Sequence, residues 1–193
     1  MKYYTVVDLE WTSWKNNYYG KYLEKENRKN WQKKEVIQIG AITFDENFKK
    51  IKTLNIFVKP KINPKLSKYI TNLTSITDKI LEVKGIKFLD AFNLLKKFSK
   101  KTFLFSNGND GLILNKNLSY NKLKKKKIII FNIKKILKKK YHIPEKYLSS
   151  PKLKIFFGLK YKKKNAHNAL YDCRSIISSM KKMNFDLKIL KKN

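Results

Sequence analysis

Three apolar segments before residue 60 constrain the fold of this chain more than any other feature. Each is rich in aromatic and β-branched residues, as buried strands are, and they span residues 3–8, 36–44 and 51–58. Only a polar turn around Asp45, Glu46 and Asn47 separates the second segment from the third, which is typical of neighbouring strands. The sequence therefore predicts a fold that begins with a three-stranded antiparallel meander.

Helical and extended patterns alternate in the rest of the chain, after Pro60 and Pro64 close the strand segment. Helical periodicity marks residues 66–69, 78–83, 88–98, 112–118, 133–140 and 169–183, and strand patterns mark 102–105 and 128–131. Residues 141–164, which contain two prolines, give no clear pattern. A meander followed by two strand–helix units predicts an α/β domain with a mixed sheet of five strands.

The length of the chain suits one domain. Its 193 residues and 23.0 kDa are enough to bury a single hydrophobic core, so we expect residues 1–193 to form one unit. Residues 11–34 interrupt the first two strands with a basic, aromatic insertion that contains all three tryptophans, Trp11, Trp14 and Trp31. Long insertions in compact domains are commonly functional or mobile.

Cysteine content and hydropathy both bear on the compartment. The single cysteine, Cys173, cannot form an internal disulfide, which favours a reducing environment. No apolar stretch approaches the ~20 residues that a membrane span requires. We therefore expect a soluble, cytoplasmic protein without a membrane partner.

The net charge of +32, from 46 Lys and Arg against 14 Asp and Glu, indicates which partners the surface attracts. Such a field favours polyanions, chiefly nucleic acid or an anionic membrane surface. Nearly all of the cations are lysines, since arginine occurs only at Arg28 and Arg174. Lysine accompanied by abundant Asn and Ile is also what an AT-rich genome encodes regardless of function, so charge alone does not identify a function.

The scarce carboxylates are more informative than the abundant lysines. Asp8 and Glu10 stand two residues apart near the end of the first predicted strand, so both project to one face. Asp110 follows the strand at 102–105, and Asp172 lies at the start of the last predicted helix, five residues after His167. Taken singly, each has a simpler interpretation: a solvated strand face, a turn or N-cap, a helix-dipole partner or a core histidine.

Taken together, these segments resemble the motifs of the DEDDh 3′-5′ exonucleases, which include proofreading subunits of bacterial polymerases and exonucleases that trim histone mRNA and small RNAs. The resemblance covers most of the chain and is strongest at the first and third motifs. The segments that carry it are Val7-Asp8-Leu9-Glu10-Trp11-Thr12, Glu35-Val36-Ile37-Gln38-Ile39-Gly40-Ala41, Ile70-Thr71-Asn72-Leu73-Thr74-Ser75-Ile76-Thr77, Ser106-Asn107-Gly108-Asn109-Asp110 and His167-Asn168-Ala169-Leu170-Tyr171-Asp172. In the fourth segment Asp110 is the best match to the family's aspartate, and Asn109 is the alternative.

The resemblance implies a ribonuclease H-like, three-layer α/β/α fold and hydrolysis assisted by two metal ions. It implies that four carboxylates hold two Mg²⁺ or Mn²⁺ ions, namely Asp8, Glu10, Asp110 and Asp172. Oxygen ligands of this kind suit those ions better than zinc. His167 would then act as the general base, and the product would be a nucleoside 5′-monophosphate released from the 3′ end.

The substrate and partners implied are the 3′ ends of single-stranded RNA or DNA. The residues expected to contact them are Trp11, Leu9, Trp14 and Asn107, with Trp11 favoured for stacking on the terminal base because it follows Glu10. Two alternatives stay open: a nucleic-acid-binding module of the same fold without turnover, and an exonuclease that works only as a subunit of a polymerase or other larger complex. The sequence leaves the oligomeric state undetermined.

Overall fold

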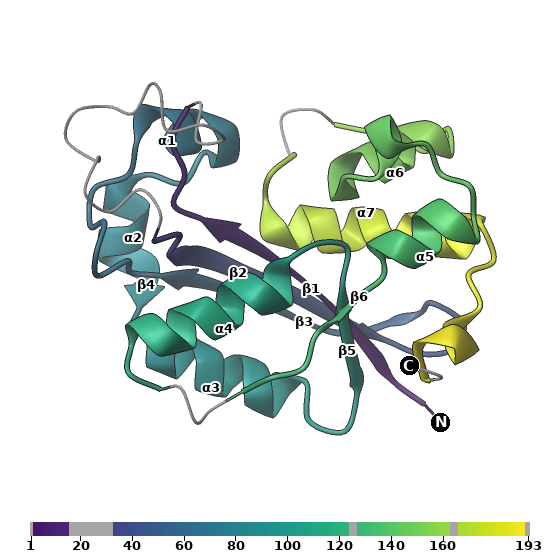
Figure 1. Cartoon of the computed structure of the whole chain (residues 1–193), viewed down its shortest axis with the longest axis horizontal. Coiled ribbons are helices and arrows are strands. Elements are labelled where there is room, and N and C mark those ends of the chain that lie inside the picture. The colour runs from purple at the N-terminus through teal and green to yellow at the C-terminus, as the bar shows by residue number, and fades with distance from the viewer. Residues whose placement is uncertain (1, 16–32, 124–126, 163–165, 192–193) are drawn as a thin grey trace.

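The computed structural model describes residues 2–15, 33–123, 127–162 and 166–191, and within them a six-stranded mixed sheet lies at the centre of the molecule (Figure 1). The strands, in chain order, are β1 Tyr4–Trp11, β2 Val36–Phe44, β3 Lys50–Val58, β4 Gly85–Ile86, β5 Phe103–Ser106 and β6 Phe131–Asn132. Their spatial order is β4-β3-β2-β1-β5-β6. The pairs β1–β2 and β2–β3 are antiparallel, while β1–β5, β5–β6 and β3–β4 are parallel. The predicted meander and the α/β class are confirmed.

Helices cover both faces of this sheet. They are α1 Lys68–Thr74, α2 Asp78–Lys84, α3 Phe88–Phe98, α4 Asp110–Tyr120, α5 Lys134–Lys139, α6 Ser150–Phe156 and α7 Ala169–Lys182, with short 3₁₀ turns η2 Glu145–Tyr147 and η4 Leu187–Lys191. Figure 1 shows α5, α6 and α7 over one face, and α3 and α4 over the other. This is the three-layer arrangement that the family resemblance implied.

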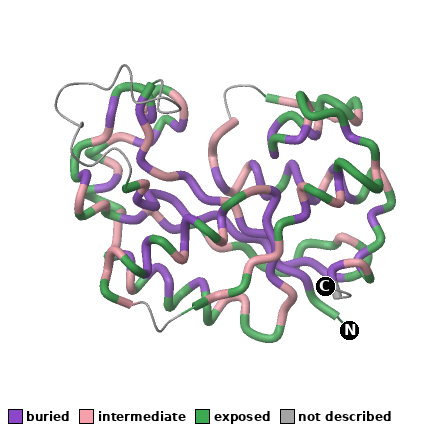
Figure 2. The backbone as a smooth tube through the Cα atoms, in the orientation of Figure 1, coloured by how far each residue is buried: buried purple, intermediate pink, exposed green. Residues whose placement is uncertain are grey.

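The alternation of β1 divides its side chains between two hydrophobic cores. Tyr4 and Val6 belong to a core shared with α7, whereas Val7 and Leu9 belong to a core shared with α3 and α4. All nine residues of β2 are buried, because this strand is covered on both faces (Figure 2). By the same alternation, Asp8 and Glu10 extend from the face of β1 on which α7 packs.

The structure differs from the sequence prediction at several elements. The first strand continues to Trp11, and the last strand is only Phe131–Asn132 rather than residues 128–131. The predicted count of five strands is wrong because the two-residue strand β4 pairs with β3 and adds a sixth. The helix α6 was not predicted, since it has only seven residues and Pro151 at its first turn had the pattern of a break.

A glycine allows α7 to lie directly on the sheet. A β-carbon at Gly40 would stand 2.5 Å from the carbonyl carbon of Ala169 and from the amide nitrogen of Leu170, so no larger residue fits there. One turn further along, the Cys173 thiol lies 3.3 Å from the Gly40 carbonyl oxygen. The start of α7 is thereby held against the two central strands.

Most of the insertion predicted at 11–34, including Trp31, lies outside the described residues. Within the part of the chain that the structure describes, no helix is both long enough and apolar enough to cross a membrane.

Candidate functional site

Asp8 and Glu10 stand near the carboxyl end of β1, where the strand still pairs with β2 but has passed the last residue that pairs with β5. Glu10 is buried and Asp8 is half-buried, although neither forms an ion pair among the described residues. They are not a solvated strand face. Burial of two adjacent carboxylates costs free energy unless a cation or hydrogen-bond donors compensate for it.

Asp110 reaches the same place from β5. Because β1 and β5 are parallel, their carboxyl ends meet at one edge of the sheet, and Asp110 is the first residue of α4 beyond β5. Its carboxylate oxygen Oδ1 accepts a hydrogen bond from the backbone N–H of Leu9, at 3.0 Å. The helix N-cap is Asn109, so the carboxylate of Asp110 is directed to β1 rather than used as a cap.

The start of α7 supplies Asp172 and His167. Here the helix is capped by Asn168, whose side-chain oxygen accepts the N–H of Tyr171 at 3.1 Å. His167 therefore has no capping role. It has a left-handed backbone with φ of 60°, a conformation that is uncommon for a residue with a side chain.

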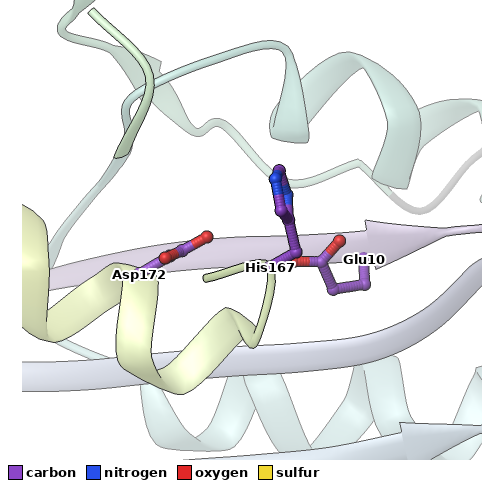
Figure 3. A group of neighbouring side chains, drawn as sticks. All are labelled: Glu10, His167 and Asp172. Carbon is purple, nitrogen blue, oxygen red and sulfur yellow. The ribbon is translucent and has the colours of Figure 1, made fainter. Parts of the chain in front are cut away.

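Glu10, His167 and Asp172 come together from these separate elements (Figure 3). One possible ligand atom from each of the three lies within 4.8 Å of the others. In Figure 3 the carboxylates extend from β1 and from α7, and the imidazole of His167 stands beside them. The three side chains are close enough to share one ion or one substrate group.

Asp8 and Asp110 lie close enough to Glu10 and Asp172 for the four carboxylates to affect one another's ionisation. Burial, and then the nearby charges of Asp110, Asp172 and Glu10, raise the pKa of Asp8 well above its usual value. Burial and the charges of Asp172 and Asp110 do the same to the pKa of Glu10. Burial likewise raises the pKa of Asp110 to about 6 and that of Asp172 to about 7. The four carboxylates thus form one acidic pocket.

Sequence reasoning missed two polar residues that position the acidic pocket. Ser150, the first residue of α6, donates a hydrogen bond from Oγ to Oδ1 of Asp8 at 3.3 Å. The side-chain oxygen Oε1 of Gln38 accepts a hydrogen bond of 3.1 Å from the backbone N–H of Ala169, and this bond connects the start of α7 to β2. The Gln38 side chain was within the quoted motif, but nothing in the sequence connected Ser150 with Asp8, which is 142 positions away.

The residues expected to contact substrate lie in different environments. Trp11 is half-buried at the end of β1, next to Glu10. Asn107 is buried beside the pocket, where its Nδ2 donates to the Leu148 carbonyl at 2.8 Å. The structure does not bring the side chain of Leu9 to the pocket, since it is in the core shared with α3 and α4, although the Leu9 backbone N–H binds Asp110 there. Trp14 is buried as well, and its indole nitrogen has no partner among the described residues.

The acidic pocket fits divalent cations on its own chemistry. Four carboxylates supply hard oxygen ligands, which Mg²⁺ and Mn²⁺ prefer. Oδ1 of Asp172 is buried and has no hydrogen-bond partner among the described residues, which is a costly state for an acceptor and one that a cation relieves. Burial and the charge of Lys152 lower the pKa of His167, so the imidazole is neutral near pH 7.

Comparison with known proteins agrees with this geometry. The family model RNase_T, described as exonuclease, matches residues 5–179. The nuclease domain of 3′hExo, a DEDDh family member, bound to rAMP, superposes with a TM-score of 0.77 at 20% identity, over 95% of this chain and 92% of that one. A structure of 3′-end recognition of a histone mRNA stem-loop by 3′-exonuclease superposes with a TM-score of 0.76 at 21% identity, over 95% of this chain and 81% of that one.

A larger protein shares the fold as well. The zinc-bound complex of E. coli exonuclease I with single-stranded DNA has a TM-score of 0.70 at 16% identity, over 100% of this chain and 42% of that one. At these identities the solved structures establish the fold alone, and the family model establishes the family. No curated protein matches the chain significantly.

Proposed function

The chain belongs to the RNase_T exonuclease family and is a 3′-5′ exonuclease, and from this premise we propose that it hydrolyses single-stranded RNA or DNA to nucleoside 5′-monophosphates with two Mg²⁺ or Mn²⁺ ions. The observation that carries the proposal is the convergence of Asp8, Glu10, Asp110 and Asp172 in one pocket beside His167. Segments that are far apart in the sequence supply these side chains. No structural role explains so many neighbouring acids.

The four carboxylates are the proposed metal ligands. Asp8 and Glu10 are fixed by β1, Asp110 by its bond to the backbone of Leu9, and Asp172 by the first turn of α7. When bound, two such ions supply charge stabilisation for the attacking and the leaving oxygens of an in-line displacement. The protein contributes a rigid arrangement of ligands on strands and helices, in which little reorganisation is needed before reaction.

His167 is the proposed general base. Its neutral imidazole accepts a proton from the attacking water on a ring nitrogen as the water oxygen bonds to phosphorus and the bond from phosphorus to the 3′-oxygen breaks. The departing 3′-oxygen takes a proton from solvent, so the shortened strand has a free 3′-hydroxyl, and the released nucleotide has a 5′-phosphate. The lowered pKa of His167 supports this role, because a protonated imidazole has no lone pair with which to accept.

Trp11 is the proposed platform for the terminal base. It is half-buried and follows Glu10 directly, so a base stacked on its indole would present the adjacent phosphate to the acidic pocket. Stacking of this kind contributes ~1–3 kcal/mol per base. The buried indole of Trp14 is a support for this segment rather than the first choice for a stacking partner.

Purified protein incubated with matched, 3′-labelled RNA and DNA oligonucleotides tests the proposal. We expect labelled 5′-mononucleotide as the first product in Mg²⁺ or Mn²⁺, none in EDTA, and a rate ratio that identifies the preferred sugar. Stoichiometric binding without release of mononucleotide would support a non-catalytic module instead. Gel filtration with activity assays tests the remaining alternative, because an active free monomer argues against an obligatory larger complex.

The cytoplasm is the compartment we propose, since the buried thiol of Cys173 is free.

A further inference from the structure

The exposed face of α6 has an unusual composition for a solvent-facing surface. Lys152, Ile155 and Phe156 are spaced three and four residues apart, so they share one side of the helix. Ile155 is 45% exposed and Phe156 is 37% exposed, whereas Leu153 on the opposite side is fully buried. The helix therefore buries one apolar side against the core and exposes a side that carries an aromatic ring, an isoleucine and a lysine.

The preceding turn extends this face. The rings of Tyr147 and Phe156 lie 5.5 Å apart between centroids, and the Lys146 ammonium stands 5.0 Å from the centre of the Tyr147 ring. We call the set of Lys146, Tyr147, Lys152, Ile155 and Phe156 the α6 surface. Its nearest carboxylate in sequence, Glu145, is already bound by Lys138 at 2.8 Å and lies close to Lys134. The α6 surface is therefore positive.

This surface adjoins the acidic pocket. Ser150 begins α6 and contacts Asp8, and Lys152 is the next exposed residue after it. On the far side of α6, the Lys154 ammonium lies 5.0 Å from the ring of Tyr171, which is next to Asp172 in α7. The helix that carries the α6 surface thus also contacts the acidic pocket, through Ser150 at its start.

We propose that the α6 surface binds the unpaired nucleotides of the substrate that precede the scissile one, by stacking bases on Phe156 and Tyr147 and by pairing phosphates with Lys146 and Lys152. The proposal rests on the proposed function and specifies how that site holds a long strand. Aromatic rings combined with cations suit single-stranded nucleic acid, because every base has a stacking face and every linkage a charge.

The double variant Lys152→Ala/Phe156→Ala tests the proposal against a matched control, Leu94→Ala/Lys97→Ala. The control pair lies on α3, across the sheet, and removes one exposed apolar side chain, Leu94 at 45% exposure, together with one exposed lysine. Two substrates are compared: an oligonucleotide of about 12 residues, which is within the usual site size, and the p-nitrophenyl ester of thymidine 5′-phosphate. The ester occupies only the scissile position.

We expect the double variant to lower the ratio of kcat/KM for the oligonucleotide to kcat/KM for the ester about tenfold or more, with a shallower salt dependence of binding. The control should keep the wild-type ratio. An unchanged ratio in the double variant, or an equal loss with both substrates, would overturn the proposal, and would leave a protein partner as the better explanation of the exposed aromatic rings.

Two further measurements keep the outcomes separate. Lys152→Glu, at an exposed position where folding is not at risk, should weaken oligonucleotide binding in EDTA more than Lys97→Glu does, and equal effects would overturn the proposal. Hydrolysis of the ester by the wild-type protein tests the proposed function independently. If the wild type hydrolyses neither substrate, the proposed function fails; if it hydrolyses both and the variant ratio is unchanged, only the α6 surface fails.

Discussion

Two regions of this molecule hold buried carboxylates whose surroundings are opposite. Glu35, just before β2, is 5% exposed and accepts hydrogen bonds on both oxygens. The donors are the backbone N–H groups of Lys61, Ile62 and Asn63, at 2.6 to 2.9 Å, together with the side-chain amide of Asn63 at 3.2 Å. Its charge is compensated entirely by the protein.

The acidic pocket lacks such compensation. Asp172 is 3% exposed, and one of its oxygens has no partner among the described residues, while Asp8 has a single long hydrogen bond from Ser150. Burial alone therefore does not distinguish a structural acid from a functional one. The hydrogen-bond donors around each carboxylate do distinguish the two kinds of acid. A buried carboxylate that the fold leaves partly without donors is suited to bind a ligand from outside the chain.

The largest effect that this comparison predicts is on turnover at Asp8. Asp8→Ala removes a proposed metal ligand but none of the basic surface, so cleavage should fall by at least about 10³-fold, the scale of several kcal/mol of lost transition-state stabilisation. Oligonucleotide binding should be largely retained in a filter-binding assay. Wild-type turnover by this variant would refute the metal assignment.

The next largest effect is expected at His167. His167→Ala should reduce kcat by roughly 10²–10⁴-fold, the usual contribution of a general base. Calorimetric titration with Mn²⁺ should show little change, since the carboxylates remain. A comparable loss of Mn²⁺ affinity would instead make the imidazole a metal ligand, a role that its distance from Glu10 and Asp172 also permits.

Glu35 should respond in the opposite way. Glu35→Ala leaves the backbone N–H groups of Lys61, Ile62 and Asn63 without their acceptor, and that of Asn63 is buried, so the free energy of unfolding should fall by about 2–4 kcal/mol. Urea denaturation measures this loss. The Mn²⁺ affinity of the folded variant should match the wild type, and a selective loss of metal binding would contradict the division between the two regions.

A smaller effect is expected at Ser150, which supports a ligand without being one. Ser150→Ala should weaken Mn²⁺ binding by about tenfold, the lower end of the range for groups that orient a metal ligand. Ser149→Ala is the matched control, because the neighbouring hydroxyl is exposed and makes no capping bond. Ser150→Thr should restore affinity, and equal behaviour of the two alanine variants would exclude the positioning role.

The smallest expected effect is a gain of stability at Asp172. Its pKa is raised to about 7 in the fold, so the folded state holds a proton that the unfolded chain releases near pH 4. Metal-free stability should therefore fall as pH rises from about 4 to 7. At pH 8 in EDTA, Asp172→Asn should raise the unfolding free energy by roughly 1 kcal/mol, and in a separate assay with Mg²⁺ the same variant should be inactive. A lower melting temperature under those conditions would argue against uncompensated charge.

Features that depend on residues close together in the sequence could be predicted from it. The strand alternation placed Asp8 and Glu10 on one face, and the apolar periodicity after His167 gave α7. Contacts between distant segments had no such signal. The bonds from Ser150 to Asp8 and from Gln38 to Ala169, and the donors to Glu35, depend on how loops and strands meet after folding. The short elements β4 and α6 offer too few residues for a period to show.

The central claim is that the under-compensated carboxylates are a metal site. A crystal structure of the protein with Mn²⁺ and a nucleoside 5′-monophosphate, analysed by anomalous scattering, tests it most directly. We predict two manganese peaks within coordination distance of Asp8, Glu10, Asp110 and Asp172, with the phosphate between them and His167. Manganese bound elsewhere, with those four side chains free of it, would contradict the account.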